Sequence, residues 1–256
     1  MRELARSFGQ IASEYDAVRP DYPPEAVERA VEALELGPDA RVVDLAAGSG
    51  TLTRALADRL PRLVAIEPDD EMRAVFARRS PGVEVRAGTA ERIPLPDRSA
   101  DAVFVGDAFH WFDGSAAVAE IVRVLRPKGG VALVWNRWWE DGDDWTADFL
   151  EPRLPSDVCA LFDEVYVRSG RRAAREEKAD PVECFADSPF GPLRVETFEQ
   201  RRQLTGPEVV DLYSTVSAVA ALPAPDRDEL KQKMLPMLDA EYRLTIATVL
   251  HWGRRA

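Results

Sequence analysis

The sequence predicts a doubly wound α/β fold built on a mostly parallel sheet. Between residues 42 and 135, short apolar runs typical of buried strands alternate with segments of helical spacing. A turn of small residues that contains Gly48 and Gly50 separates the first strand from the first helix of this series. A hydrophobic content of 46% in 256 residues is ordinary for a globular protein with a sizeable core. Strands that alternate with helices favour parallel pairing with right-handed crossovers.

Periodicity then gives the individual elements. Helical spacing covers 7–20 and 24–34, with Pro24 at a first helical position and Gly37 expected as the C-terminal cap. The alternating series has strands at 42–45, 63–67, 83–86, 102–105 and 131–135, and helices at 51–60, 71–79 and 116–125. Beyond it we expect a helix at 158–168, a strand at 193–198, helices at 207–218 and 226–238, and a last strand at 242–250.

The chain shows no internal repeat and no low-complexity linker, so a single domain is predicted. After Trp135 the alternation stops, and the stretch that follows is rich in Trp, Asp, Glu and Arg. We therefore expect a core at 25–137 and 190–256, an N-terminal cap at 1–24, and a lid or insertion at 138–189.

Composition excludes several classes of function. A net charge of −12 disfavours a large nucleic-acid interface, which needs a basic surface. No apolar run is long enough to span a bilayer, and the polar N-terminus lacks the apolar core of a signal peptide, so we expect a cytoplasmic protein without a membrane partner. Two cysteines and two histidines in all predict inert thiols and no metal site.

Candidate binding residues follow four predicted strands. Glu67 ends the second strand, nineteen residues beyond Gly48, where a carboxylate accepts both hydroxyls of a ribose. Carboxyl ends of neighbouring parallel strands meet at one edge of a sheet, which is where such folds bind ligands. Taken singly, Glu67 is equally well explained as a helix cap, and Phe109 and Trp111 as core residues. The four segments are Asp44 to Gly50, Glu67 to Met72, Gly88 to Glu91, and Asp107 to Trp111.

These residues resemble the class I S-adenosylmethionine-dependent methyltransferases, in their small-molecule branch (type 11-like). The matching motifs are residues 42–50, 67–68, 88–95, 101–103 and 125–130. The Ala-Phe-His-Trp-Phe run at 108–112, with the upstream Tyr15 and Arg19-Pro20-x-Tyr22-Pro23, resembles the subgroup of trans-aconitate methyltransferases. The resemblance implies a Rossmann-like, seven-stranded, mostly parallel sheet with helices on both faces and a helical lid.

The resemblance also implies S-adenosylmethionine as cofactor, S-adenosylhomocysteine as product, and no metal. Ala46 stands where the family has glycine, and we expect it to be tolerated in an ordinary backbone region. Thr89 stands where many relatives have Asp, so Glu91 or backbone carbonyls are expected to read the adenine amino group. The implied cofactor-binding residues are Tyr15, Arg19, Asp44, Ala46, Gly48, Ser49, Gly50, Glu67, Pro68, Met72, Thr89, Ala90, Glu91, Asp107, Ala108 and Phe109.

By the same resemblance, an acceptor oxygen, nitrogen or carbon attacks the sulfonium methyl in line, and the enzyme contributes mainly orientation and exclusion of water. His110 is the catalytic candidate, as a base or as a hydrogen-bond donor; the alternative is that it packs between Phe109 and Trp111. Arg19 or Arg137 would clamp a carboxylate acceptor, although Arg19 is equally suited to the cofactor's own carboxylate. Candidates for the acceptor pocket are Trp111, Trp135, Arg137, Trp138, Trp139, Trp145 and Tyr213.

The expected partner is thus a small-molecule methyl acceptor, and the protein is expected to be a monomer or homodimer. A non-catalytic protein that binds or senses adenosylmethionine or adenosylhomocysteine is the main alternative. An NAD-dependent reductase is disfavoured, because a third glycine and a Tyr-x-x-x-Lys pair are missing. A nucleic-acid methyltransferase is disfavoured by the acidic charge and by the lack of a base-flipping motif after the fourth strand.

Overall fold

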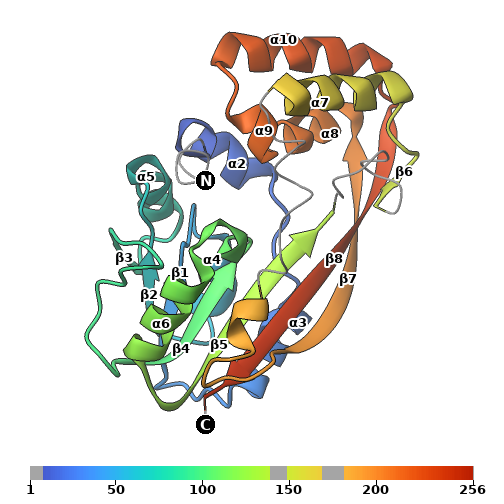
Figure 1. The fold of residues 1–256 in the computed structure, drawn as a ribbon. Helices are drawn as coiled ribbons and strands as arrows, with labels where there is room; N and C mark the ends of the chain where they lie inside the picture. The colour runs from blue at the N-terminus through green and yellow to red at the C-terminus, as the bar shows by residue number, and fades with distance from the viewer. Residues whose placement is uncertain (1–7, 139–148, 169–181, 256) are drawn as a thin grey trace. The chain divides into compact units, whose positions relative to one another are not determined.

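A computed structural model describes residues 8–138, 149–168 and 182–255 (Figure 1). The chain divides into two compact units, each made of several segments. The larger unit comprises 20–136, 179–198 and 248–256, and the smaller one comprises 1–19, 137–178 and 199–247.

The strands form one mixed sheet whose hydrogen-bonded order is β3-β2-β1-β4-β5-β8-β6, with β7 also paired to β8 (Figure 1). The pairs β1–β2, β1–β4, β2–β3 and β4–β5 are parallel, whereas β6 pairs antiparallel with β8. The doubly wound, mostly parallel fold class predicted from the sequence is confirmed. The strands are β1 (Arg41–Leu45), β2 (Arg62–Ile66), β3 (Glu84–Arg86), β4 (Ala100–Gly106), β5 (Leu125–Arg137), β6 (Leu150–Glu151), β7 (Arg194–Thr205) and β8 (Glu241–Arg254).

Both faces of the larger unit's sheet are covered by apolar side chains. Successive side chains of a strand point to opposite faces, and in β1 the neighbours Val42 and Val43 belong to two different buried clusters. Val42 packs with residues of α3 (Pro24–Ala33) and α4 (Thr51–Ala57), and Val43 packs with residues of α6 (Gly114–Val124). A sheet buried on both faces reads as continuous apolar runs, as these strands do.

Two further short elements of the larger unit lie next to its predicted binding residues. Helix α5 (Asp70–Arg79) begins just after Glu67, with Asp69 as its N-cap. The 3₁₀ turn η2 (Phe109–Trp111) follows β4 and precedes α6, whose N-cap is Asp113. Another 3₁₀ turn, η4 (Glu183–Phe185), supplies Phe185 to the core of this unit.

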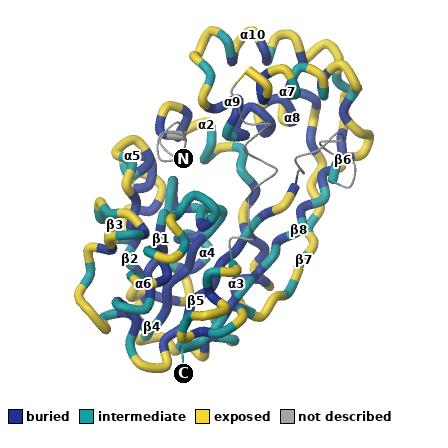
Figure 2. Tube along the Cα trace, in the orientation of Figure 1, coloured by how far each residue is buried: buried dark blue, intermediate teal, exposed yellow. Residues whose placement is uncertain are grey.

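The smaller unit is mainly helical and has its own apolar core. Its buried cluster includes Trp138, Phe162, Tyr213 and Met234. Figure 2 shows α10 exposed along much of its length, with buried residues recurring on one side. Its helices are η1 (Phe8–Ile11), α2 (Ala12–Val18), α7 (Ser156–Arg168), α8 (Gly206–Tyr213), α9 (Ser217–Ala220), α10 (Ala224–Met234) and η5 (Leu235–Met237).

Two helical segments differ from the elements expected from the sequence. Helix α3 ends at Ala33, and Glu35, with φ 55°, takes the left-handed conformation, whereas the C-terminal cap was expected at Gly37. The helix expected at 207–218 is divided into α8 and α9, because the hydroxyls of Ser214 and Thr215 bond back to the carbonyls of Val210 and Leu212.

Candidate functional site

The turn after β1 carries three residues in the left-handed region. These are Ala46 with φ 57°, Gly48 with φ 56° and Gly50 with φ 93°. Ala46 therefore does not lie in the ordinary backbone region in which we expected alanine to be tolerated. The chain keeps the conformation that suits glycine at this position and places an alanine in it, at a free-energy cost of about 1–2 kcal/mol.

The two glycines of the turn have different surroundings. A Cβ at Gly48 would meet no atom within 4 Å, so its backbone borders open space. A Cβ at Gly50 would lie 2.9 Å from Phe76 of α5, so this residue is held by packing. Gly50 thus closes the turn against α5, whereas Gly48 leaves its backbone approachable by a ligand.

Glu67 connects the turn after β1 to the end of β2. Its side chain is only 6% exposed, and its two carboxylate oxygens accept hydrogen bonds from the backbone N–H groups of Gly48 and Asp69, each at 2.9 Å. Burial raises the pKa of Glu67 to about 7, against the lowering effect of these bonds. Pro68, the next residue, is exposed. Met72 is buried, and its backbone N–H donates a hydrogen bond to Oδ1 of Asp69, the N-cap of α5.

Asp44 and Ser49 lie on the same turn and are almost fully buried. Thr53 of α4 donates a 2.5 Å hydrogen bond to Asp44 Oδ2, and burial raises the pKa of Asp44 to about 6. Among the residues that the structure describes, Asp44 Oδ1 and Ser49 Oγ have no hydrogen-bond partner. Buried polar atoms are normally satisfied, so these two favour a ligand that brings donors to this turn.

The segment after β3 is tied to the beginning of α6. Thr89 is exposed and forms an isolated bridge with Arg92, while Ala90 is buried in the core. Glu91 accepts a hydrogen bond at Oε1 from the backbone N–H of Asp113, at 3.1 Å. One oxygen of the carboxylate expected to read adenine is therefore engaged by the N-cap of α6.

Asp107 directly follows β4 and has a left-handed φ of 49°. Its Oδ2 accepts from the Tyr22 hydroxyl and its Oδ1 from the Asn136 N–H, both at 3.0 Å. Ala108, which follows it, is half-buried, whereas Phe109 is 1% exposed and packs on Phe185 at 5.1 Å between ring centroids. For Phe109 the structure agrees with the core interpretation.

His110, Trp111 and Trp135 lie together in the larger unit. Trp135 Nε1–H donates to His110 Nδ1 at 3.4 Å, and the rings of His110 and Trp111 are 4.9 Å apart. Trp135 also meets the ring of His251 edge to face, with centroids 5.5 Å apart and an interplanar angle of 89°. His251 and the Trp135–His110 bond carried no signal in the sequence.

Five described candidates belong to the smaller unit, and their relation to the edge of the sheet stays a prediction. The Arg19 guanidinium lies over the rings of Tyr15 and Trp138, at 4.6 and 5.0 Å, and donates to the Thr215 carbonyl at 2.7 Å. Tyr213 is buried, and burial strongly raises the pKa of its hydroxyl. Arg137 is exposed, whereas Trp139 and Trp145 lie outside the described residues.

Sequence reasoning missed a polar network in the larger unit. The Asn136 side chain donates to the Pro20 carbonyl at 3.0 Å and accepts from the Thr248 hydroxyl at 2.6 Å. With Tyr22, it holds the carboxylate of Asp107 through its own N–H. Only Asn136 could have indicated this network from the sequence, because it is a polar residue directly after a predicted buried strand.

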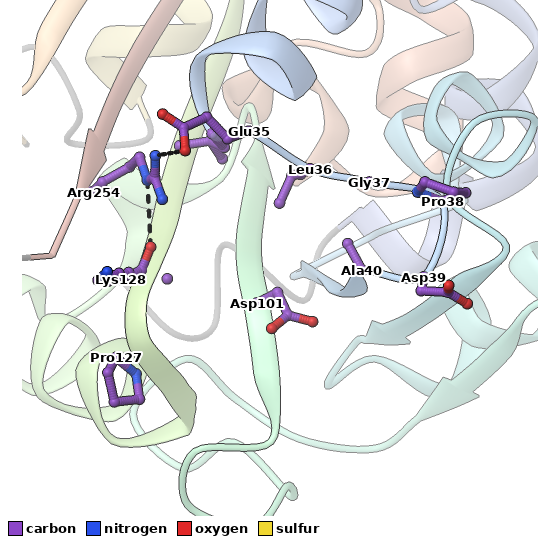
Figure 3. Close-up of a pocket in the computed structure, with 12 residues that line it drawn as sticks. Glu35, Leu36, Gly37, Pro38, Asp39, Ala40, Asp101, Pro127, Lys128 and Arg254 are labelled. Carbon is purple, nitrogen blue, oxygen red and sulfur yellow. Dashed lines mark hydrogen bonds and ion pairs between the residues drawn. The ribbon is translucent and has the colours of Figure 1, made fainter.

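A cavity of about 460 Å³ lies at the opposite, amino-terminal end of the same strands. Ala40, Asp101 and Gly129, which line it, stand before or at the beginning of β1, β4 and β5. In Figure 3 Arg254 pairs with Glu35 and donates to the Lys128 carbonyl beside this hollow. Doubly wound sheets bind ligands at carboxyl ends, so this cavity is not the site predicted from the sequence.

Comparisons with known proteins point to one family. Residues 43–133 match the family described as "Methyltransferase domain". An uncharacterized methyltransferase of Mycobacterium tuberculosis is 44% identical over 135 residues, which are 53% of this chain and 54% of the relative. An uncharacterized methyltransferase-like protein of Schizosaccharomyces pombe is 29% identical over 230 residues, covering 90% of this chain and 84% of the relative. The chain thus matches about half the length of the first relative.

The fold has counterparts among solved structures. A candidate type II methyltransferase from Anaeromyxobacter dehalogenans superposes with a TM-score of 0.59 at 24% identity, covering 92% of this chain and 97% of that one. The matched domain and these relatives are thus those of methyltransferases, and the solved structure shares the fold. The narrower likeness to trans-aconitate methyltransferases stays a prediction.

The residues present fit S-adenosylmethionine. Gly48 borders open space, Glu67 ends β2 with a buried carboxylate, and Asp44 keeps one oxygen without a partner in the described part of the chain. Within the described ranges, no group of three or more metal-binding side chains is gathered, and none of the helices is long and apolar enough to cross a membrane.

Proposed function

We propose that this protein transfers a methyl group from S-adenosylmethionine to a small-molecule acceptor. The observation that carries the proposal is the pairing of Glu67, at the end of β2, with the open turn at Gly48, joined by a 2.9 Å hydrogen bond. A carboxylate at this position binds ribose hydroxyls, and a glycine turn lets the adjoining part of the ligand approach the backbone. When bound, the cofactor supplies an electrophilic methyl group on a positively charged sulfur.

Each segment after a strand then has a role in the proposal. Glu67 holds the sugar, and Asp44 with Ser49 accepts donors from the amino-acid part. Pro68 and Met72 lie beside the adenine, with Ala90 and Glu91 at its far edge. Ala46, Gly50, Thr89, Asp107 and Ala108 shape the backbone around it.

The protein's share of the catalysis is orientation and exclusion of water. Holding the acceptor in line with the methyl group supplies on the order of 7–11 kcal/mol in favourable cases. Oxygen, nitrogen and carbon acceptors are all compatible with this step. The acceptor is expected to be a small molecule, because a net charge of −12 disfavours a nucleic-acid substrate.

Calorimetry with S-adenosylhomocysteine tests the cofactor half of the proposal. We expect binding by the full chain, and a large loss of affinity in Glu67→Ala. Glu84→Ala on β3 is the matched control, since Glu84 is an exposed carboxylate paired to Arg86. No binding by the wild-type protein would overturn the proposal.

Transfer itself is tested with methyl-labelled cofactor and a panel of small acids, phenols, alcohols and amines. Label in one class of acceptor is the expected result. Binding of the cofactor without transfer to any acceptor would favour the non-catalytic sensing protein instead.

A further inference from the structure

The cavity at the amino-terminal end of the strands has no part in the proposed methyl transfer. Its volume of about 460 Å³ lies within the range of about 300–1,000 Å³ that is common for small-molecule sites. Its lining residues all belong to the larger unit, so one compact unit is enough to form it. They come from the loop 34–40 after α3, the beginning of β4, the segment 127–129 of β5 and the end of β8.

The charged side chains around this cavity leave one positive charge over. Each carboxylate that lines it is paired with an arginine, so these charges cancel. Lys128 also lines the cavity, and within the described ranges its ammonium group has no carboxylate partner. The site is thus locally cationic in a protein whose net charge is −12. The three pairs are Glu35–Arg254, Asp39–Arg62 and Asp101–Arg126.

The backbone that carries Lys128 is held in an unusual conformation. Lys128 and Glu35 have φ values of 66° and 55°, and they are two of the five described residues other than glycine with a positive φ. Arg254 joins them, because its guanidinium pairs with Glu35 and its Nε–H donates to the Lys128 carbonyl at 3.3 Å (Figure 3). Such conformations persist only where the surrounding structure enforces them, and they cluster at functional sites.

Apolar side chains line another part of the same cavity. Leu34 is 3% exposed, and Leu36 and Ala40 are half-buried. A Cβ at Gly37 would meet no atom within 4 Å, so the loop backbone borders open space here. A ligand can therefore place an apolar body against this loop while a charged group meets Lys128.

We propose that this cavity binds a small organic anion, with carboxylate or phosphate oxygens on the Lys128 ammonium group and an apolar part against Leu34 and Leu36. The anion supplies the opposite charge that Lys128 lacks, in a charge-assisted hydrogen bond. The cofactor turn at Gly48 follows the other end of β1, so this inference does not depend on the proposed methyl transfer.

The surroundings of Lys128 favour a ligand with a single anionic group. The side chains of Glu35 and Asp39 are 71% and 89% exposed and stand on the loop that lines the cavity. A long polyanion that reached Lys128 would meet these carboxylates, and their arginines are already paired. A compact anion avoids this repulsion, because it needs only the one cationic group.

An NMR titration of the full chain, labelled with ¹⁵N, tests the binding. The probes are benzoate and phenyl phosphate, which combine an oxyanion with an apolar ring, and benzylamine, which keeps the ring and reverses the charge. We expect saturable shifts of the amide signals of Gly37, Lys128 and Gly129 with at least one anion, with a Kd of about 1 mM or lower, and none with benzylamine. The anion that binds more tightly identifies a carboxylate or a phosphate ester as the ligand group.

Substitution of Lys128 tests its role in the binding. Lys128→Gln removes the charge and keeps a side chain of similar length, and it should weaken the binding of the anion about tenfold, whereas Lys128→Arg should retain it. Lys233→Gln is the matched control, since it removes a lysine charge that is paired with Glu229 on α10, and it should leave the affinity unchanged.

Three results would overturn the proposal. The first is the absence of saturable shifts with both anions in the wild-type protein. The second is a response at the amides of Gly48 and Gly50 alone, which would place the anion at the cofactor turn. The third is equal affinity of the wild type and Lys128→Gln, with a spectrum of the variant that shows it to be folded.

Discussion

At Ala46 a single side chain sits in a conformation that favours glycine. The left-handed φ of 57° brings Cβ close to the following carbonyl oxygen, which costs about 1–2 kcal/mol in an L-residue. The turn after β1 nevertheless keeps this geometry, because Gly50 is packed against Phe76 and the Gly48 N–H is bonded to Glu67. The strain is thus localised where the proposed ligand meets the backbone.

We expect Ala46→Gly to raise the free energy of unfolding by about 1 kcal/mol, since relief of strain exceeds the added chain entropy of glycine in the unfolded state. Urea denaturation measures the change. Gly50→Ala is the control and is expected to lower the free energy of unfolding, because the new Cβ would lie 2.9 Å from Phe76 at a φ of 93°. A destabilised Ala46→Gly would show that the methyl group makes compensating contacts.

The raised pKa of Glu67 gives cofactor affinity a pH dependence. Ionised Glu67 accepts two ribose hydrogen bonds, whereas the protonated acid loses part of that capacity. With a pKa of about 7, the ionised fraction falls as pH drops through 7. Affinity for S-adenosylhomocysteine should therefore be weaker at pH 6 than at pH 8, by at most about tenfold, the ratio of the ionised fractions.

Calorimetry at a series of pH values measures this effect. Glu67→Gln should bind more weakly at pH 8 and lose most of the pH dependence between 6 and 8. A wild-type affinity that is constant over this range would show that Glu67 is already ionised at pH 6 or does not contact the ligand.

The sequence predicted the carboxylate at the end of β2 and the two glycines, but not the backbone state of Ala46. Residue type alone leaves φ open, and alanine is normally found in right-handed or extended regions. The network of Tyr22, Asp107, Asn136 and Thr248 was missed for another reason. Asn136 and Thr248 are 112 positions apart, and no local pattern reports contacts at such separations.

At the scale of elements, α6 is fixed at both ends by residues from elsewhere in the chain. Asp113 caps its N-terminus through Ala116 N–H and is itself bonded to Glu91. At the other end, Arg255 Nη1 donates to the carbonyls of Val122 and Leu125, at 2.9 and 3.0 Å. These contacts set the position of the helix that follows η2, where His110 lies.

We expect Arg255→Ala to lower the free energy of unfolding by about 1–3 kcal/mol, because two partly buried carbonyls lose a charged donor. Arg243→Ala is the matched control. Its partner Glu151 lies 3.4 Å away and both side chains are more than half exposed, so its loss should cost less than about 1 kcal/mol. Equal effects of the two substitutions in urea denaturation would contradict the capping role.

The seven strands expected from the sequence, five in the alternating series and two beyond it, are all present, and the sequence was least informative about their boundaries. β5 begins at Leu125 and β8 extends to Arg254, beyond the apolar runs at 131–135 and 242–250. Pairing with neighbouring strands extends a strand past its apolar segment, and the β-propensity of the residues does not predict this extension. β6, with two residues, left no signal, and the break between α8 and α9 depends on two hydroxyl groups that bond back to the helix.

At the scale of the whole molecule, the chain passes between the two units five times, after Arg19, Asn136, Lys178, Phe198 and Ala247. Residues of the larger unit at three of these points are joined by hydrogen bonds. Asn136 bonds to the carbonyl of Pro20 and to the hydroxyl of Thr248, the first residues of two other passages. One buried side chain thus secures three separate segments.

We therefore expect Asn136→Ala to lower the free energy of unfolding by about 2–4 kcal/mol, since it leaves the buried Thr248 hydroxyl and the Pro20 carbonyl without this partner. Thr248→Val alone should cost about 1–2 kcal/mol, because it removes one of these bonds. A double-mutant cycle measured by urea denaturation should give a coupling of about 1 kcal/mol. Additive losses would show that the Thr248 bond contributes nothing of its own.

The strand order also determines when the sheet becomes complete during synthesis. β8 lies between β5 and β6 and also pairs with β7, yet it leaves the ribosome after all three. Until then the nascent chain presents the open edge of β5, which is a template for pairing with other chains. The interval between translation of β5 and of β8 is consequently the period in which this protein depends most on protection from aggregation.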